Sequence, residues 1–196
     1  MPASSVRPMS RKSRLVWLLG VTFLALVLDQ ASKIYAMNWL TQTANDPISC
    51  LADTLRVQYA HNDGAFLSLM SSLSNDVRFW VLTVINGVVL IGLAVYLLLA
   101  REVTAANFVP LMLVVAGGLG NLIDRIRFGY VIDFLNVGIG GLRTGIFNIA
   151  DMFITAGFIV MAVVLIRGEK EQAAVKKTLN SHESPDPVHV PREGQI

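Results

Sequence analysis

The chain has 196 residues, of which 54% are hydrophobic and only 15% are charged, and its formal net charge is +2. Soluble domains carry about 25% charged residues, so this composition provides too few charges to cover a water-facing surface. The small positive charge reflects basic residues that flank the apolar segments rather than a surface for nucleic acid. The composition therefore predicts an integral membrane protein without a nucleic-acid partner.

Four apolar segments provide the transmembrane helices that this composition predicts, each needing about 20 residues to cross a bilayer. The first, at 15–28, is short and must continue through Asp29 and Lys33 to complete a crossing. Segments 79–100 and 105–123 contain no charged residue, and 147–166 contains only Asp151. We therefore predict an α-helical membrane domain of four spans at residues 15–167.

Two segments between the spans, about 41–78 and 124–146, contain strand patterns. Leu55, Val57 and Tyr59 alternate with polar residues, which is typical of a half-buried strand. Residues 130–137 are rich in aromatic and β-branched side chains. Because unpaired strand edges are not tolerated in lipid, we expect the two segments to pair as a small β-rich element on the membrane surface.

The orientation follows from the basic residues that flank the first span. Four of them precede it: Arg7, Arg11, Lys12 and Arg14. We therefore expect a cytoplasmic basic segment at 1–14, and four spans return the C-terminus to the same side. Residues 168–196 are polar and contain several prolines, so we expect a disordered cytoplasmic tail there. The two loops and the β-rich element would then be extracytoplasmic. Arginines in the second loop argue against this orientation, but the first helix usually dominates.

Polar side chains in or beside the spans are costly, roughly 2.5–3.5 kcal/mol for each charge at a helix centre. With the spans placed as above they gather toward one end: Asp29, Lys33, Asn62, Asn121, Asp124, Arg125, Asp133, Asn148 and Asp151. Asp29 and Lys33 are four residues apart on a helix and can neutralise each other. Asp124 and Arg125 can likewise form an interfacial ion pair. Asp133 lies in an apolar, strand-like run and therefore needs a partner from elsewhere in the chain.

The chain lacks the sequence motifs of several kinds of catalytic site, which limits the reactions that this cluster could catalyse. Cys50 has no metal-ligand spacing around it and two of the three histidines lie in the tail, so we expect no metal and no cofactor. No nucleophile-elbow serine, P-loop or dinucleotide motif occurs. Two close carboxylates share one proton and can act as base and acid together.

The residues alone thus indicate a carboxylate site in a membrane and leave three functions open. One is hydrolysis, and another is a small proton-coupled transporter or channel subunit that uses buried carboxylates. The third is a non-enzymatic membrane scaffold, which would leave Asp133 unexplained. Transporters place charges near the midplane and often show an internal repeat. Here the charges gather at one end and no repeat at span scale is visible, which favours hydrolysis.

Five short motifs occur in order along residues 12–167. They are Asp29-Gln30-Ala31-Ser32-Lys33, Asn62-Asp63-Gly64-Ala65-Phe66, Gly117-Gly118-Leu119-Gly120-Asn121-Leu122-Ile123-Asp124-Arg125, Gly129-Tyr130-Val131-Ile132-Asp133-Phe134 and Phe147-Asn148-Ile149-Ala150-Asp151. In these motifs the chain resembles the lipoprotein signal peptidase (signal peptidase II) family. One motif alone would be a weak signal, whereas five in order are a strong one.

The resemblance implies an aspartic endopeptidase of the bacterial inner membrane, with its active site toward the periplasmic or outer face. Its substrate would be a diacylglyceryl-modified prolipoprotein, cut just before the lipidated cysteine. Membrane lipid would surround the enzyme, which we expect to be a monomer without a cofactor.

The resemblance also implies roles for individual residues. By motif position Asp133 and Asp151 would be the catalytic pair, and Asp29 and Lys33 would be structural. Five residues would support catalysis or bind substrate: Asn62, Asn121, Asp124, Arg125 and Asn148. Two positions depart from the family pattern, because Ala116 replaces a frequent glycine and Met152 a residue that is commonly small.

Overall fold

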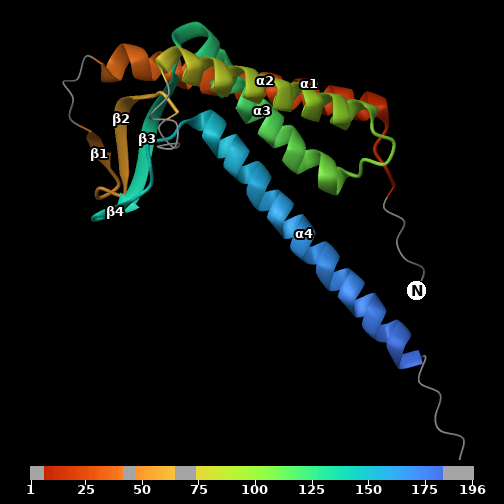
Figure 1. Ribbon diagram of the computed structural model, residues 1–196. Helices are drawn as coiled ribbons and strands as arrows, with labels where there is room; N and C mark the ends of the chain where they lie inside the picture. The colour runs from red at the N-terminus through yellow and green to blue at the C-terminus, as the bar shows by residue number, and fades with distance from the viewer. Residues whose placement is uncertain (1–6, 42–46, 65–73, 183–196) are drawn as a thin grey trace, which may run out of the picture. The chain divides into compact units, whose positions relative to one another are not determined.

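The computed structural model describes residues 7–41, 47–64 and 74–182 (Figure 1). Ala65 and Phe66 of the second motif, residues 1–6 and residues 183–196 of the predicted tail lie outside the described residues. The described residues form four helices: α1 (Arg11–Leu40), α2 (Asn75–Leu99), α3 (Ala105–Phe128) and α4 (Ile149–His182). They also form four strands: β1 (Ile48–Cys50), β2 (Leu55–Asn62), β3 (Val131–Ile139) and β4 (Leu142–Arg143).

Each helix contains a stretch that is long and apolar enough to cross a bilayer. These stretches are Arg11–Leu40, Phe79–Leu99, Ala105–Phe128 and Ile149–Ala174. Large apolar side chains on the helices are exposed, among them Phe23 at 70%, Val88 at 64% and Phe158 at 64%. A soluble protein rarely exposes so much contiguous apolar surface, whereas lipid can cover it. The prediction of an α-helical protein with four membrane-spanning helices is confirmed in these terms.

The strands form one antiparallel sheet in the order β1-β2-β3-β4. Its centre pairs β2 with β3, as expected from the two loop segments, with an irregular register between Val57 and Ala60. The two short outer strands, β1 and β4, were not predicted. The sheet packs on the end of α1, where Ala36 and Leu40 form a buried cluster with Phe134 of β3.

Glycines on α3 allow the neighbouring helices to approach its backbone. A Cβ atom on Gly120 would lie 2.6 Å from Asp29 Oδ2 and 3.1 Å from the Cβ of Ala150. Contacts below 3.0 Å are essentially never made by real Cβ atoms, so a side chain here would displace one of the two partners. The small residues of the third motif therefore bring α1, α3 and the start of α4 together.

Helix boundaries differ from the predicted ones at three places. α3 continues to Phe128 and ends at Gly129, whose φ of 86° is left-handed, so Asp124 and Arg125 lie on the helix rather than in the loop 124–146. α1 begins at Arg11, and Arg14 is buried inside the fold rather than free in a flanking segment. α4 continues to His182, so the first part of the predicted disordered tail, 168–182, is helical. That stretch is rich in Glu, Lys, Gln and Ala, which are good helix formers.

Candidate active site

Asp133 lies on β3 and receives a hydrogen bond on each carboxylate oxygen. The amide Nδ2 of Asn62, at the end of β2, donates to Asp133 Oδ2 at 2.9 Å. Nδ2 of Asn148 donates to Asp133 Oδ1 at 2.7 Å. Asn62 is held by its own Oδ1, which accepts from the backbone N–H of Gly64 at 2.9 Å. The partner that Asp133 needs is thus supplied by two asparagines from other elements.

Asp151 is positioned by the cap at the start of α4. The Oδ1 atom of Asn148 accepts from the backbone N–H of Asp151 at 2.9 Å, and the backbone N–H of Asn148 donates to Asp151 Oδ2 at 3.2 Å. This reciprocal arrangement is a capping box, in which two otherwise unpaired backbone donors are satisfied. The spacing of the two residues on the fifth motif therefore fixes the direction of the Asp151 carboxylate.

Two asparagine side chains connect the aspartates. Asn121 of α3 donates from Nδ2 to Asp151 Oδ1 at 2.7 Å. Its Oδ1 atom accepts from Nδ2 of Asn148 at 3.0 Å, and the same Nδ2 reaches Asp133. A continuous chain of amides thus runs from one carboxylate to the other. Asn148 is fully buried and Asn121 is 7% exposed, so water does not compete freely for these bonds.

A buried charged cluster supports the two segments that carry the aspartates. Lys33 Nζ lies 2.9 Å from Asp29 Oδ2, 2.8 Å from Asp124 Oδ2 and 3.1 Å from Asn121 Oδ1. Asp29 Oδ1 also accepts from the backbone N–H of Ala150 at 2.9 Å, and Asp124 Oδ2 from that of Ile132 at 3.1 Å. Ala150 and Ile132 immediately precede the two aspartates in sequence. The cluster therefore holds the backbone beside each of them.

The predicted pairing of Asp29 with Lys33 is present, but the ion pair between Asp124 and Arg125 is not found among the described residues. Asp124 pairs with Lys33 instead. Arg125 lies where the charges of Asp151, Asp133 and Asp124 act on it, and it lines a small cavity together with Asp63 and Tyr130.

Gln30 belongs to the same network and was missed as a site residue. Its Nε2 atom donates to Asp124 Oδ1 at 2.9 Å, and its Oε1 atom accepts from Arg127 at 3.4 Å. An amide inside an apolar span, next to Asp29 in the first motif, is the signal that would have identified it.

Burial raises the pKa of Asp133 to about 6. The negative charge of Asp151 adds to the rise, whereas the hydrogen bonds from Asn62 and Asn148 oppose it. Asp133 is 2% exposed, and desolvation disfavours the charged form of a carboxyl group. The environment of Asp133 therefore favours retention of a proton.

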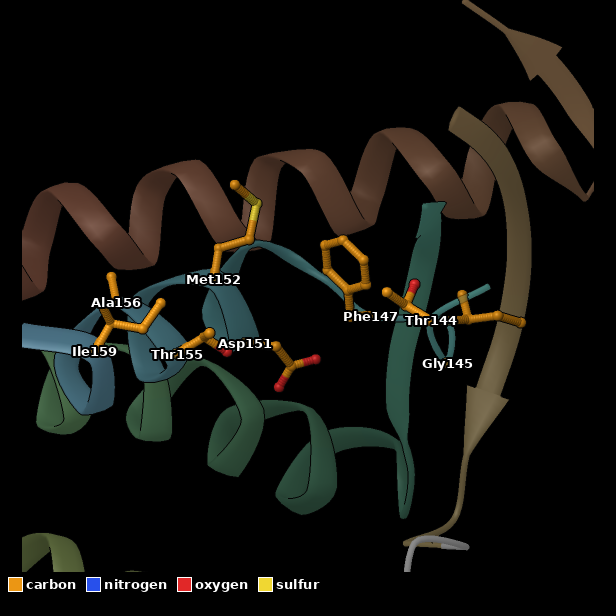
Figure 2. Close-up of a pocket in the computed structure, with 9 residues that line it drawn as sticks. Thr144, Gly145, Phe147, Asp151, Met152, Thr155, Ala156 and Ile159 are labelled. Atoms are coloured by element: carbon orange, nitrogen blue, oxygen red, sulfur yellow. The ribbon is translucent and has the colours of Figure 1, made fainter. Parts of the chain in front are cut away.

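Asp151 lines a groove with a volume of about 560 Å³, which we call the aspartate groove. Residues 144–147 form one side of it, and Asp151, Met152, Thr155, Ala156 and Ile159 of α4 form the other (Figure 2). Its wall is mostly apolar, and Asp151 contributes a carboxylate to it. Within the described part of the chain, no three His, Cys, Asp or Glu side chains are grouped to hold a metal ion.

Comparison with known proteins identifies the family. The sequence profile of Signal peptidase (SPase) II matches residues 21–167. The chain belongs to the signal peptidase II family. A lipoprotein signal peptidase of Sphingopyxis alaskensis is 36% identical over 155 residues, covering 78% of this chain and 87% of the relative. One of Acinetobacter baumannii is 37% identical over 158 residues, covering 81% and 87%.

Solved structures show that bacterial membrane enzymes have a similar fold. The chain is similar to a bacterial membrane enzyme with a TM-score of 0.65 and 26% sequence identity, covering 76% of this chain and 91% of that one. A second bacterial membrane enzyme gives a TM-score of 0.61 at 27% identity, covering 86% and 93%. Family membership makes the chain a bacterial membrane peptidase and gives no support to the transporter or channel alternative.

The structure brings most of the predicted site residues into one connected network. The bonds described above join Asp29, Lys33, Asn62, Asn121, Asp124, Asp133, Asn148 and Asp151. Arg125 lies beside this network without an ion pair to any described residue.

Proposed function

We propose that this signal peptidase II removes signal peptides from diacylglyceryl-modified prolipoproteins as an aspartic endopeptidase with Asp133 and Asp151 as its catalytic pair. One observation carries the proposal: the two carboxylates come from different elements and are joined by Asn121 and Asn148, and one of them, Asp151, lines a groove. Carboxylates coupled in this way supply an acid and a base together.

In this proposal Asp133 is the general acid and Asp151 is the general base. Burial favours the protonated form of Asp133. Asp151 accepts hydrogen bonds from Asn121 and from the backbone of Asn148, and it lies in the first turn of α4, where the helix dipole favours negative charge. The different surroundings of the two carboxylates support this assignment of acid and base.

The reaction then begins with water held between the carboxylates. Asp151 takes a proton from the water as its oxygen attacks the scissile carbonyl carbon, and Asp133 donates its proton to the carbonyl oxygen. When the tetrahedral intermediate collapses, Asp151 passes the proton to the leaving amine and Asp133 recovers one from the hydroxyl group. The pair returns to its starting state without a cofactor.

The remaining residues would act on the pair or on the substrate. Asn62, Asn121 and Asn148 would orient the carboxylates through their amide donors. Asp29, Lys33 and Asp124 would hold the backbone on both sides of the site, which is a structural role. Arg125 would offer a positive charge to the developing oxyanion or to the substrate backbone.

The proposal includes a membrane orientation. We place both termini in the cytoplasm, the sheet and the aspartates on the periplasmic or outer side of the inner membrane, and a monomer in the bilayer. Reporter fusions after Ser74, Arg101 and Gly141 test the orientation, because only Arg101 should then report a cytoplasmic position. A reporter active outside at Arg101 would contradict the arrangement.

The catalytic pair is tested by cleavage of a lipidated prolipoprotein by the purified protein. Asparagine is nearly isosteric with aspartate but neither carries the charge nor shuttles the proton. Asp133→Asn and Asp151→Asn should each lower turnover by at least about 10²–10⁴-fold, the usual contribution of acid–base catalysis. Because the two residues act as a unit, the double variant should be little worse than either single one.

Asp76→Asn is the matched control, because Asp76 is an exposed aspartate at the start of α2, outside the network. It should turn over substrate like the parent protein. Near-normal turnover by folded Asp133→Asn would refute the assignment, and Asp124 would then be the next candidate to act opposite Asp151.

A further inference from the structure

A second groove lies beside the start of α4, and its lining carries no polar side chain. It has a volume of about 390 Å³ and is formed by three helices. Its lining consists of Leu28 of α1, Leu113 of α3, and Ile149, Met152, Phe153 and Ala156 of α4. We call it the apolar groove.

The apolar groove and the aspartate groove share two residues, Met152 and Ala156. Met152 follows Asp151 directly, and Figure 2 shows the two side chains projecting in different directions from the start of α4. The Met152 side chain is 49% exposed and unbranched, so it can adapt to what lies on either side of it. Met152 is therefore the partition between the proposed catalytic carboxylate and the apolar groove.

The chemistry of the lining decides what the apolar groove can hold. A peptide backbone seated among Leu28, Leu113 and Phe153 would have unpaired N–H and C=O groups, which cost several kcal/mol each away from water. A hydrocarbon chain has no such groups to satisfy. The aspartate groove does offer polar partners to a peptide, namely Thr144, Thr155 and Asp151.

We propose that the apolar groove binds one acyl chain of the diacylglyceryl group on the substrate's cysteine, and that Met152 controls the passage of this chain from the aspartate groove. The inference rests on the proposed function, because that function places a lipidated cysteine next to the scissile bond at Asp151. It adds a specificity site, and makes Met152 a residue that determines which lipid is accepted.

The expected effects are moderate, because lipid tails in the bilayer are as apolar as the groove. The gain on binding comes from packing rather than from removing the chain from water. A substrate group that fits an apolar pocket poorly lowers kcat/KM by about tenfold or more. We therefore expect an effect of about tenfold, at the lower end of that range.

The test compares two substrates with the same peptide, one with two palmitoyl chains and one with two octanoyl chains. Leu28→Phe narrows the apolar groove and should lower kcat/KM for the palmitoyl substrate by about tenfold, with the octanoyl substrate changed by less than about twofold. Met152→Ala opens the partition and should reduce the difference between the two substrates. Met152→Leu should keep the parent preference.

Phe158→Ala is the control, since Phe158 is an exposed residue of the same helix and lines neither groove. It should leave both values of kcat/KM unchanged. Thermal unfolding in detergent verifies that each variant is folded, and if Leu28→Phe does not fold, Met152→Ala decides.

Two outcomes would overturn the inference. Equal losses with both lipids would mean that the groove does not sense acyl length. No change at all would mean that bulk lipid alone fills it. Failure of the proposed function is distinct, because the parent protein would then cleave neither substrate.

Discussion

α1 carries buried charges in two places, and they serve the molecule in different ways. Arg14 near its start donates from Nη1 to the backbone oxygens of Leu97 at 2.7 Å and Ala100 at 2.8 Å, at the end of α2. Lys33, about 28 Å farther along the helix at 1.5 Å per residue, is bound by two carboxylates and an amide. Both side chains are 1–2% exposed.

The difference lies in where each set of bonds leads. The bonds of Arg14 end on carbonyl groups that a helix terminus leaves unpaired, so Arg14 closes a helix end. The bonds of Lys33 continue through Asn121 to Asp151 and through Asp124 to the backbone beside Asp133. A buried charge is thus not by itself a sign of function; its connection to further titratable groups is.

The largest effect on stability is expected at Lys33. Lys33→Met would leave Asp29 and Asp124 buried without a cation, and breaking a buried ion pair on one side costs about 3–5 kcal/mol. We expect a strongly lowered unfolding temperature in detergent and a low yield. The triple variant Lys33→Met, Asp29→Asn, Asp124→Asn should recover part of the loss. An unfolding temperature like that of the parent would show that the cluster is not a buried charge network.

A smaller effect is expected from the titration of Asp133. Its raised pKa of about 6 in the folded protein, against about 3.9 in an unfolded chain, means that the folded state binds the proton more tightly. This contribution to the free energy of unfolding therefore falls as the pH rises from about 4 to about 6, and is constant above that.

The measurement is the difference in unfolding temperature between Asp133→Asn and the parent protein from pH 4 to pH 8. Taking the difference cancels the other titrating groups that the substitution leaves unchanged. The unfolding temperature of the variant should rise relative to that of the parent as the pH rises from about 4 to about 6. A difference independent of pH would mean that the pKa of Asp133 is not raised in the folded protein.

The smallest effect is expected at Arg14. Arg14→Met removes two hydrogen bonds to backbone carbonyls but strands no charge, and leaving such acceptors unpaired costs about 1–3 kcal/mol. Turnover per folded molecule should match the parent, because Arg14 makes no bond to the network that contains the two aspartates. A loss of turnover as large as that of Asp151→Asn would contradict the view that Arg14 only closes a helix end.

The sequence was sufficient for the helices and for the two central strands, because apolar length and alternation are local signals. β1 and β4 are only three and two residues long, and their pairing depends on neighbours that no local pattern reveals. The end of α3 was misplaced because charged residues were assigned to a loop, although charges near a helix end are ordinary.

The residues of the network could be predicted, because they are polar residues that an apolar span would otherwise exclude. The hydrogen bonds and ion pairs between them could not be predicted. Asp124 is next to Arg125 in the sequence, which predicted an ion pair between them, but in the structure it pairs with Lys33. This pair could not be predicted from sequence, because side chains of α1 and α3 meet only when the two helices pack together. The Asn148 amide that reaches Asp133 crosses from one element to another in the same way.

The capping box at Asn148 and Asp151 has a consequence for resistance to inhibitors. Asp151 closes the start of α4 as well as facing the groove, so a substitution there that repelled an inhibitor would also loosen the helix. Met152 next to it lines both grooves, and its side chain makes none of the hydrogen bonds of the network. Substitutions that give resistance to an inhibitor bound at the Asp151 carboxylate are therefore expected to arise at Met152.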